Sequence, residues 1–160
     1  MFSAPFLPAP HVAPGRALVR RVATAAALAM IASTAHAGVV EIAVTGIVQA
    51  RGHVRVQLCT KDTFLKPSCP YEASAPATLG ETVVKVNNVE PGEYAATAFH
   101  DESDQGVVHQ NFLGIPRERI GFSNNASVHV HGPRFKDAAF FVGHEAQQIT
   151  LKVRHLFRGD

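Results

Sequence analysis

Short segments typical of β-strands recur along the chain, and they limit the fold more than any other feature. In most of them apolar and polar residues alternate, as Val54, Val56 and Leu58 do with their polar neighbours. This period of two places every second side chain on one face, as in a strand with one buried face. The predicted strands are Val40–Thr45, His53–Leu58, Thr82–Val86, Tyr94–His100, Ser127–His131, Ala138–Val142 and Ile149–Arg154.

About seven short strands at turn-punctuated intervals predict an all-β fold. Each apolar strand face needs a second layer to cover it, so we expect a two-sheet β-sandwich, with a small β-barrel as the alternative. No window keeps the 3.6-residue apolar period of a helix. Residues 70–80, which contain proline, are interpreted as a loop or an irregular edge, and residues 87–92 as a turn around Pro91-Gly92.

The first 37 residues have the order of a secretory signal rather than of folded structure. Arginines at 16, 20 and 21 precede an apolar run over Val22–Ile31, and Ala35-His36-Ala37 then supplies a small-residue cleavage site. The run is about half the length that a membrane-spanning helix needs, which is roughly 20 residues. We therefore predict a signal peptide at 1–37, a single β-sandwich domain at 38–160, and export by the general secretory route to the periplasm or the medium.

The net charge argues against a nucleic-acid partner. Without residues 1–37 the chain keeps 12 basic residues against 13 acidic ones, a net charge of −1. Binding to nucleic acid needs clustered Lys and Arg, and the mature sequence has no such cluster. No segment after residue 37 is predicted to span a membrane, so the expected partner is a small ligand or another envelope protein.

The two cysteines, Cys59 and Cys69, are ten positions apart. In an oxidising compartment an even pair at this spacing predicts a disulfide, which would contribute about 3 kcal/mol by closing the short loop between them. A metal pair or a redox centre would more often have the spacing C-x-x-C.

The stretch from Phe99 to Ala126 lacks a regular apolar period and gathers carboxylates, histidines, asparagines and glycines. Its start resembles a calcium loop, because oxygen-bearing side chains alternate from Asp101 and a glycine stands at the sixth position. The twelfth position is Phe112 instead of a carboxylate, and the ninth is His109. The sequence thus favours a solvated acidic turn without a cofactor. The alternative is a calcium, zinc or copper site, for which the candidate ligands are Asp101, Glu102, Asp104 and His109.

Two further groups of side chains could carry chemistry. His129 and His131 would share one face of a strand and could reach one metal ion. Residues of the types that a hydrolase uses also occur together, namely His100, Asp101, Glu102, His109, Glu118 and Ser123. No nucleophile elbow, zinc-protease helix or phosphate loop accompanies them, so the residue types alone are weak support for an enzyme.

Several short motifs together resemble a bacterial secreted family, the domain-of-unknown-function family 2141. They are Pro91-Gly92-x-Tyr94, Phe99-His100-Asp101-Glu102, Asn111-Phe112-Leu113-Gly114-Ile115-Pro116, Gly121-Phe122-Ser123-Asn124-Asn125 and Phe135-x-Asp137-Ala138-Ala139-Phe140. The resemblance implies an exported bacterial protein with an immunoglobulin-like or prealbumin-like sandwich, and no established activity. It marks His100, Asn111, Gly114, Pro116, Gly121, Phe122, Ser123 and Asn124 as the signature of the long loop.

Family members often carry the motif D-E-N-x-N-G-x-x-D at this loop. This chain has Ser103 and Gln105 in place of the two asparagines, and His109 in place of the last aspartate.

The sequence favours an exported, non-enzymatic β-sandwich that binds a ligand through residues 99–126. Two alternatives stay open. One is a metal-dependent or acid–base enzyme using His100, Asp101, Glu102 and His109, and the other is a purely structural envelope module.

Overall fold

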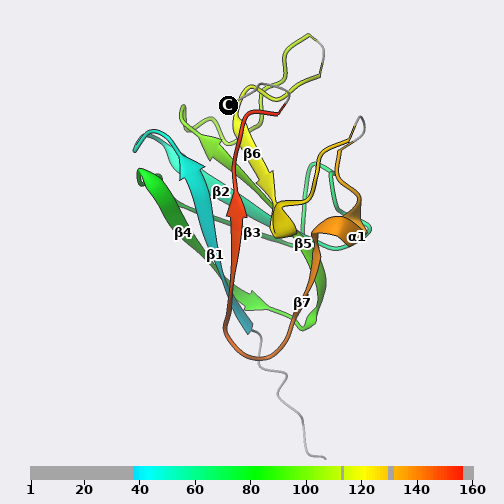
Figure 1. Ribbon diagram of the computed structural model, residues 1–160. Helices are drawn as coiled ribbons and strands as arrows, with labels where there is room; N and C mark the ends of the chain where they lie inside the picture. Colours follow the sequence, from blue (N-terminus) through cyan, green and yellow to red (C-terminus); the bar gives the residue numbers. More distant parts are fainter. Residues whose placement is uncertain (1–37, 113, 130–131, 157–160) are drawn as a thin grey trace, which may run out of the picture. The chain divides into compact units, whose positions relative to one another are not determined.

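The computed structural model describes residues 38–112, 114–129 and 132–156, and within them the predicted two-sheet β-sandwich is confirmed (Figure 1). The predicted signal peptide lies outside these residues. The first sheet has the strand order β4-β1-β8, formed by Gly80–Val89, Gly38–Ile47 and Gln147–Lys152. Strand β1 is antiparallel to β4 and parallel to β8. No helix in the described part of the chain is long and apolar enough to cross a membrane.

The second sheet has five strands, and four of them follow the order β3-β2-β5-β6. They are Tyr71–Pro76, His53–Cys59, Gly92–Asp101 and Arg119–Phe122. The fifth strand, β7 (Ala139–Val142), pairs with the first half of β5, while β6 pairs with its second half. Strands β6 and β7 therefore share one edge of β5. A short 3-10 helix, η1 (Ser123–Asn125), and a single-turn helix, α1 (Phe135–Ala138), lie between them in the sequence.

The hydrophobic core lies between the two sheets and follows from the alternation of apolar residues. Val40, Ile42 and Val44 of β1 are fully buried, and Val54, Val56 and Leu58 of β2 are buried opposite them. Complete burial of each such side chain contributes roughly 1.5–3 kcal/mol. Strand β5 supplies small side chains to this core, which lets the sheets approach closely. Tyr94 adds a hydrogen bond from its hydroxyl to the Glu90 carbonyl (3.1 Å), which ties the start of β5 to the preceding turn.

A second apolar cluster lies on the outer face of the five-stranded sheet. Alternate residues of β5 point into the core and outward. The outward-pointing Ala95 and Phe99 join Ile120 and Phe122 of β6 on this face. Loops cover the cluster, and Phe64 of the loop after β2 packs edge-on against Phe122 with ring centroids 6.1 Å apart. The five-stranded sheet is thus apolar on both faces in this region, which positions the site described below.

The strand predicted at 127–131 is not found in its described residues, 127–129. Ser127 and Val128 are not in a strand, and His129 forms an isolated bridge with Gly132. These residues belong to a loop. Their apolar and polar side chains alternate because Val128 packs on the outer cluster while His129 is exposed. Residues 130 and 131 lie outside the described part of the chain. The strand lies earlier, at Arg119–Phe122, within the stretch interpreted as a loop.

The region between β2 and β5 is also more regular than expected. Residues 71–76, which the sequence analysis assigns to a loop or irregular edge, form β3, a regular strand at the edge of the sheet. Its inward side chains include Ala73 and Ala75, whose small size weakens the apolar alternation in the sequence. Strand β4 continues to Val89 instead of ending before a turn at 87. Asn88 has a positive φ of 57°, and the pairing with β1 shifts register there.

Candidate functional site

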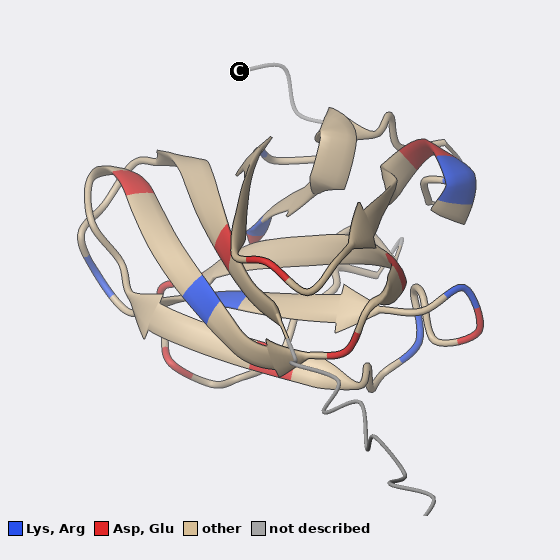
Figure 2. Ribbon diagram, turned by 90° about the horizontal axis from the view of Figure 1, so that it is seen from below, with Lys and Arg blue, Asp and Glu red and all other residues tan. Residues whose placement is uncertain are grey.

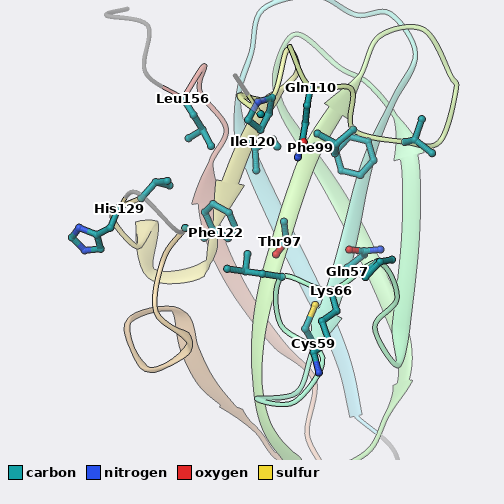
Figure 3. Close-up of a pocket in the computed structure, with 18 of the residues that line it drawn as sticks. Gln57, Cys59, Lys66, Thr97, Phe99, Gln110, Ile120, Phe122, His129 and Leu156 are labelled. Carbon is teal, nitrogen blue, oxygen red and sulfur yellow. The ribbon is translucent and has the colours of Figure 1, made fainter. Parts of the chain in front are cut away.

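The outer face of the five-stranded sheet carries a pocket of about 670 Å³ (Figure 3). Its floor consists of Phe99 from β5 and of Ile120 and Phe122 from β6. The antiparallel register places Phe99 opposite Ile120 and Thr97 opposite Phe122, so their side chains share one face. The floor is therefore built on paired strands, whereas the rim is built from loops.

The loop between the two cysteines forms one side of the rim. The predicted Cys59–Cys69 disulfide is present, with a Cα–Cα distance of 4.7 Å. Within the loop that it closes, Leu65, Lys66 and Pro67 line the pocket. Phe64 anchors the loop on the outer cluster, where its ring also packs edge-on against Phe135 at a centroid distance of 5.7 Å. The disulfide thus helps to shape a wall of the pocket.

The rest of the rim comes from the long stretch that the sequence marked as the candidate site. Val107, Val108, Gln110, Gly114 and Pro116 line the pocket from this stretch. Additional lining residues come from two segments that sequence reasoning did not connect with it. Val128 and His129 lie within the strand predicted at 127–131 and Gly132 follows it, and Leu156 is near the end of the described chain. The pocket therefore collects parts of the chain that are far apart in the sequence.

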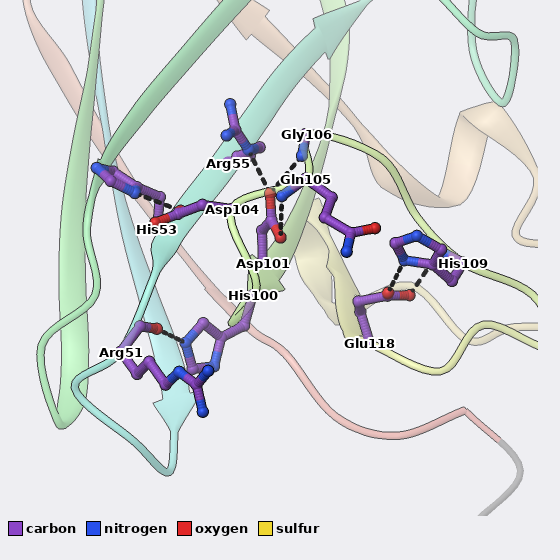
Figure 4. A network of polar contacts seen from close by, with 10 residues as sticks. All are labelled: Arg51, His53, Arg55, His100, Asp101, Asp104, Gln105, Gly106, His109 and Glu118. Carbon is purple, nitrogen blue, oxygen red and sulfur yellow. Dashed lines mark hydrogen bonds and ion pairs between the residues drawn. The ribbon is translucent and has the colours of Figure 1, made fainter.

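The acidic turn is organised by Asp101 (Figure 4). Its carboxylate, only 1% exposed, accepts hydrogen bonds from Gly106 N–H (2.7 Å), Gln105 N–H (3.1 Å) and Arg55 Nε (2.8 Å). Burial raises the pKa of Asp101, but the hydrogen bonds from Gly106, Arg55 and Gln105 outweigh it and hold the pKa below its usual value. The first residue of the candidate calcium loop thus directs its oxygens at the loop's own N–H groups.

The four candidate metal ligands each lie beside a different partner, and Figure 4 shows this for Asp101, Asp104 and His109. Asp101 is bound as described above. Asp104 Oδ1 lies 2.6 Å from His53 Nδ1, and His109 Nδ1 lies 2.7 Å from Glu118 Oε1. Glu102 Oε1 is 3.7 Å from His100 Nδ1. Among the described residues, no group of three or more His, Cys, Asp or Glu side chains is arranged to hold a metal ion. His131, the second member of the predicted histidine pair, lies outside the described residues.

His109 and Glu118 close the base of a hairpin formed by residues 109–112 and 114–118. Glu118 also accepts the His109 backbone N–H (2.9 Å), and the Arg117 N–H donates to the His109 carbonyl (2.8 Å). At the tip, the Asn111 side chain accepts the Ile115 N–H (3.0 Å), and Gly114 supplies a positive φ of 76°. The hairpin holds Phe112 94% exposed. The Asn111 and Gly114 signature positions therefore shape this turn.

The Gly121–Asn125 signature joins strands rather than forming a catalytic group. Ala96 of β5 lies between the stretches that pair with β6 and with β7, and its N–H donates to Ser123 Oγ (2.9 Å). The same hydroxyl donates to the Ala138 carbonyl, and Asn124 Nδ2 donates to the Ala139 carbonyl (2.9 Å). A Cβ at Gly121 would overlap the Lys152 carbonyl of the other sheet. These residues hold β6, and with it half of the pocket floor, in place.

The side chains of the types that a hydrolase uses do not meet at one cleft. His100 is buried on the inner face of β5, where its Nε2 lies 2.8 Å from the Arg51 carbonyl, whereas its neighbour Asp101 points to the outer face. Ser123 is buried among backbone groups. Of the six residues, His109 pairs with Glu118 and His100 Nδ1 lies 3.7 Å from Glu102 Oε1, and none of the six lines the pocket.

The pocket contains polar residues that sequence reasoning missed. Gln57 and Thr97 lie on its floor, and Lys66 is at its disulfide side (Figure 3). The Gln57 amide donates to Glu72 Oε1 (2.7 Å), which fixes its orientation. The alternation of side chains along a strand could have located two of these residues. Gln57 and Thr97 are on the faces opposite the core residues of their strands. Their convergence depends on the pairing of β2 with β5, which places Gln57 opposite Thr97.

Comparison with known proteins agrees with the motif combination noted above. The sequence model of a family described as "Uncharacterized protein conserved in bacteria (DUF2141)" matches residues 42–150. The chain belongs to this family. The part that matches the DUF2141 model extends from β1 into β8 and includes both sheets, the disulfide and the pocket floor. No curated protein and no solved structure matches the chain.

Proposed function

We propose that this DUF2141 protein is an exported, non-catalytic binding module whose ligand occupies the pocket on the outer face of the five-stranded sheet. The observation that carries the proposal is the pocket itself, about 670 Å³ with Phe99, Ile120 and Phe122 on its floor. Sites for small molecules are commonly concave, mostly apolar and roughly 300–1,000 Å³ in volume, with a few polar groups that orient the ligand. Gln57 and Thr97 are suited to that orienting role.

The arrangement of rigid and loop segments supports the same function. The floor is held by the β5–β6 pairing and by the Ser123 bridge, so it is preformed. The rim consists of loops, which are the segments that carry binding residues on many β-sandwiches. A preformed pocket avoids part of the ordering cost that binding would otherwise include.

Two features support export. The N-terminal sequence has the charged, apolar and small-residue segments of a secretory signal. The Cys59–Cys69 pair is oxidised, which is the usual state of paired cysteines outside the cytosol. Expression of the full chain in a bacterial host tests the proposal. A periplasmic product whose mass corresponds to cleavage after residue 37 supports export, and an uncleaved product in the cytosol contradicts it.

Binding is tested with Nile red, an uncharged dye whose fluorescence rises in apolar surroundings. We expect saturable binding to the processed protein, and weaker binding in Thr97→Phe, because the larger ring occupies part of the floor on which the dye would lie. Val83→Phe is the matched control, since Val83 is exposed on β4 of the other sheet. Equal dye affinity in both variants and the unmodified protein, with all three folded by circular dichroism, would contradict the proposal.

A further inference from the structure

The charge of the pocket lining is one-sided, although the protein as a whole is not strongly charged. Acidic and basic residues are interspersed along the ribbon in Figure 2. The described residues that line the pocket nevertheless include no Asp or Glu, while Lys66 contributes a cation and His129 an imidazole. A ligand with a positive charge would find no carboxylate among these lining residues, and Glu72, beside the floor, already accepts the Gln57 amide. A ligand with a negative charge would find the Lys66 amine.

The apolar surface of the pocket continues outward to its rim. Leu65 and Val107 line the pocket and are about half exposed, at 49% and 55%. They extend the apolar floor of Phe99, Ile120 and Phe122 toward the solvent. A compact polar ligand would leave this surface uncovered, whereas an elongated apolar chain would cover it from floor to rim. Burial of such a chain is favourable in proportion to the apolar area removed from water.

The position of Lys66 sets where a charged group can lie. Lys66 is exposed in the disulfide loop and lines the pocket, so its ammonium group stays hydrated. An anionic head group beside Lys66 would keep most of its own hydration and avoid the large cost of burying an unpaired charge. The apolar part of the same molecule would then extend along the floor.

We infer that the pocket binds a single-chain anionic amphiphile, with its carboxylate beside Lys66 and its hydrocarbon chain over Phe99, Ile120 and Phe122. This inference rests on the proposed function, because it specifies the ligand class of the same pocket. An exposed ion pair contributes up to about 1 kcal/mol, which corresponds to about a fivefold change in affinity. Each buried methylene contributes about 0.8 kcal/mol, or nearly a fourfold change.

The test compares three ligands with the same chain length and different head groups. Dodecanoate, dodecan-1-ol and dodecyltrimethylammonium compete with Nile red on the processed protein, below their micelle-forming concentrations. We expect dodecanoate to bind about fivefold more tightly than the alcohol, and the ammonium compound to bind weakest. Decanoate should bind more than tenfold more weakly than dodecanoate, because two methylene groups are lost.

Lys66→Gln should weaken dodecanoate binding about fivefold and so remove the preference for dodecanoate over dodecan-1-ol. Lys61→Gln is the matched control, because Lys61 lies in the same disulfide loop and does not line the pocket. Equal affinities for the three head groups, or a preference that survives in Lys66→Gln, would overturn the inference while pocket binding stands. Dye binding that Thr97→Phe leaves unchanged would instead overturn the proposed function.

Discussion

Replacement of Ser123 by alanine should weaken the five-stranded sheet at the point where β6 and β7 meet. Ser123 is 1% exposed, and its hydroxyl satisfies the Ala96 N–H and the Ala138 carbonyl at the same time. Alanine has no group that replaces these hydrogen bonds, and water has little access because Ala96 and Ala138 are fully buried. Both backbone groups would lose their partner.

The expected magnitude follows from these two groups. Leaving a buried donor or acceptor without a partner costs about 1–3 kcal/mol. Small shifts of the backbone can partly restore hydrogen bonds to the Ala96 N–H and the Ala138 C=O. We therefore expect a loss of about 2 kcal/mol in the free energy of unfolding, the low end for two such groups. For a domain of this size, that corresponds to a fall of roughly 8 °C in the melting temperature.

Urea unfolding monitored by circular dichroism measures this loss, with Ser74→Ala as the control. Ser74 is exposed on the edge strand β3, so its replacement should change the free energy of unfolding by less than about 0.5 kcal/mol. The slope against urea should be the same in the three proteins, because the exposed area on unfolding is unchanged. A Ser123→Ala variant as stable as Ser74→Ala would refute the reasoning about the bridge.

Three other changes test separate parts of the account. Asp101→Asn should lower the free energy of unfolding at pH 7, because the folded-state pKa of Asp101 is depressed. The difference in this free energy from the unmodified protein should shrink below about pH 4, as measured by urea unfolding. Replacing Cys59 and Cys69 together by serine should cost about 3 kcal/mol, measured by thermal unfolding, and a reducing agent should destabilise the unmodified protein but not this variant. Gly121→Ala should unfold at a lower temperature than the unmodified protein in calorimetry, because its Cβ would overlap the Lys152 carbonyl; an unchanged melting temperature would show that the two sheets are not in such close contact.

Much of the fold could be predicted from the sequence, because the strands with one buried face keep the period of two. Val54, Val56 and Leu58 show that pattern without interruption, and they form the buried side of β2. The pattern was less informative where side chains are small, as in β3, and where a strand has only four residues, as in β6. In both cases pairing with a neighbouring strand stabilises an extended segment whose own apolar signal is weak.

The candidate site was harder to predict, because it depends on contacts between distant segments. The stretch from Phe99 to Ala126 does supply part of the pocket, including Phe99, Ile120 and Phe122. Its conspicuous acidic residues, however, serve local structure: Asp101 fixes a turn and Glu118 closes a hairpin. Residue types alone could not distinguish a carboxylate that accepts backbone N–H groups from one that faces a ligand, since both uses favour the ionised form.

The contribution of Lys66 and Thr97 could be identified only with the sheet pairing and the disulfide loop in view. They are separated by the whole of β3 and β4 in the sequence, and they line one pocket because β2 pairs with β5 and the loop after β2 folds over the outer face. The alternation in the sequence predicts that Thr97 points away from the core. It does not predict which loop lies above it.

The most direct test of the central claim is an NMR measurement of contacts between protein and ligand. Intermolecular nuclear Overhauser effects are recorded for the processed protein with dodecanoate and, separately, with dodecan-1-ol. The account predicts contacts from the ligand chain to Phe99, Ile120 and Phe122, and none to Val83 on the other sheet. Contacts that map to Val83 and its neighbours, or no contacts to the three floor residues with either ligand, would contradict it.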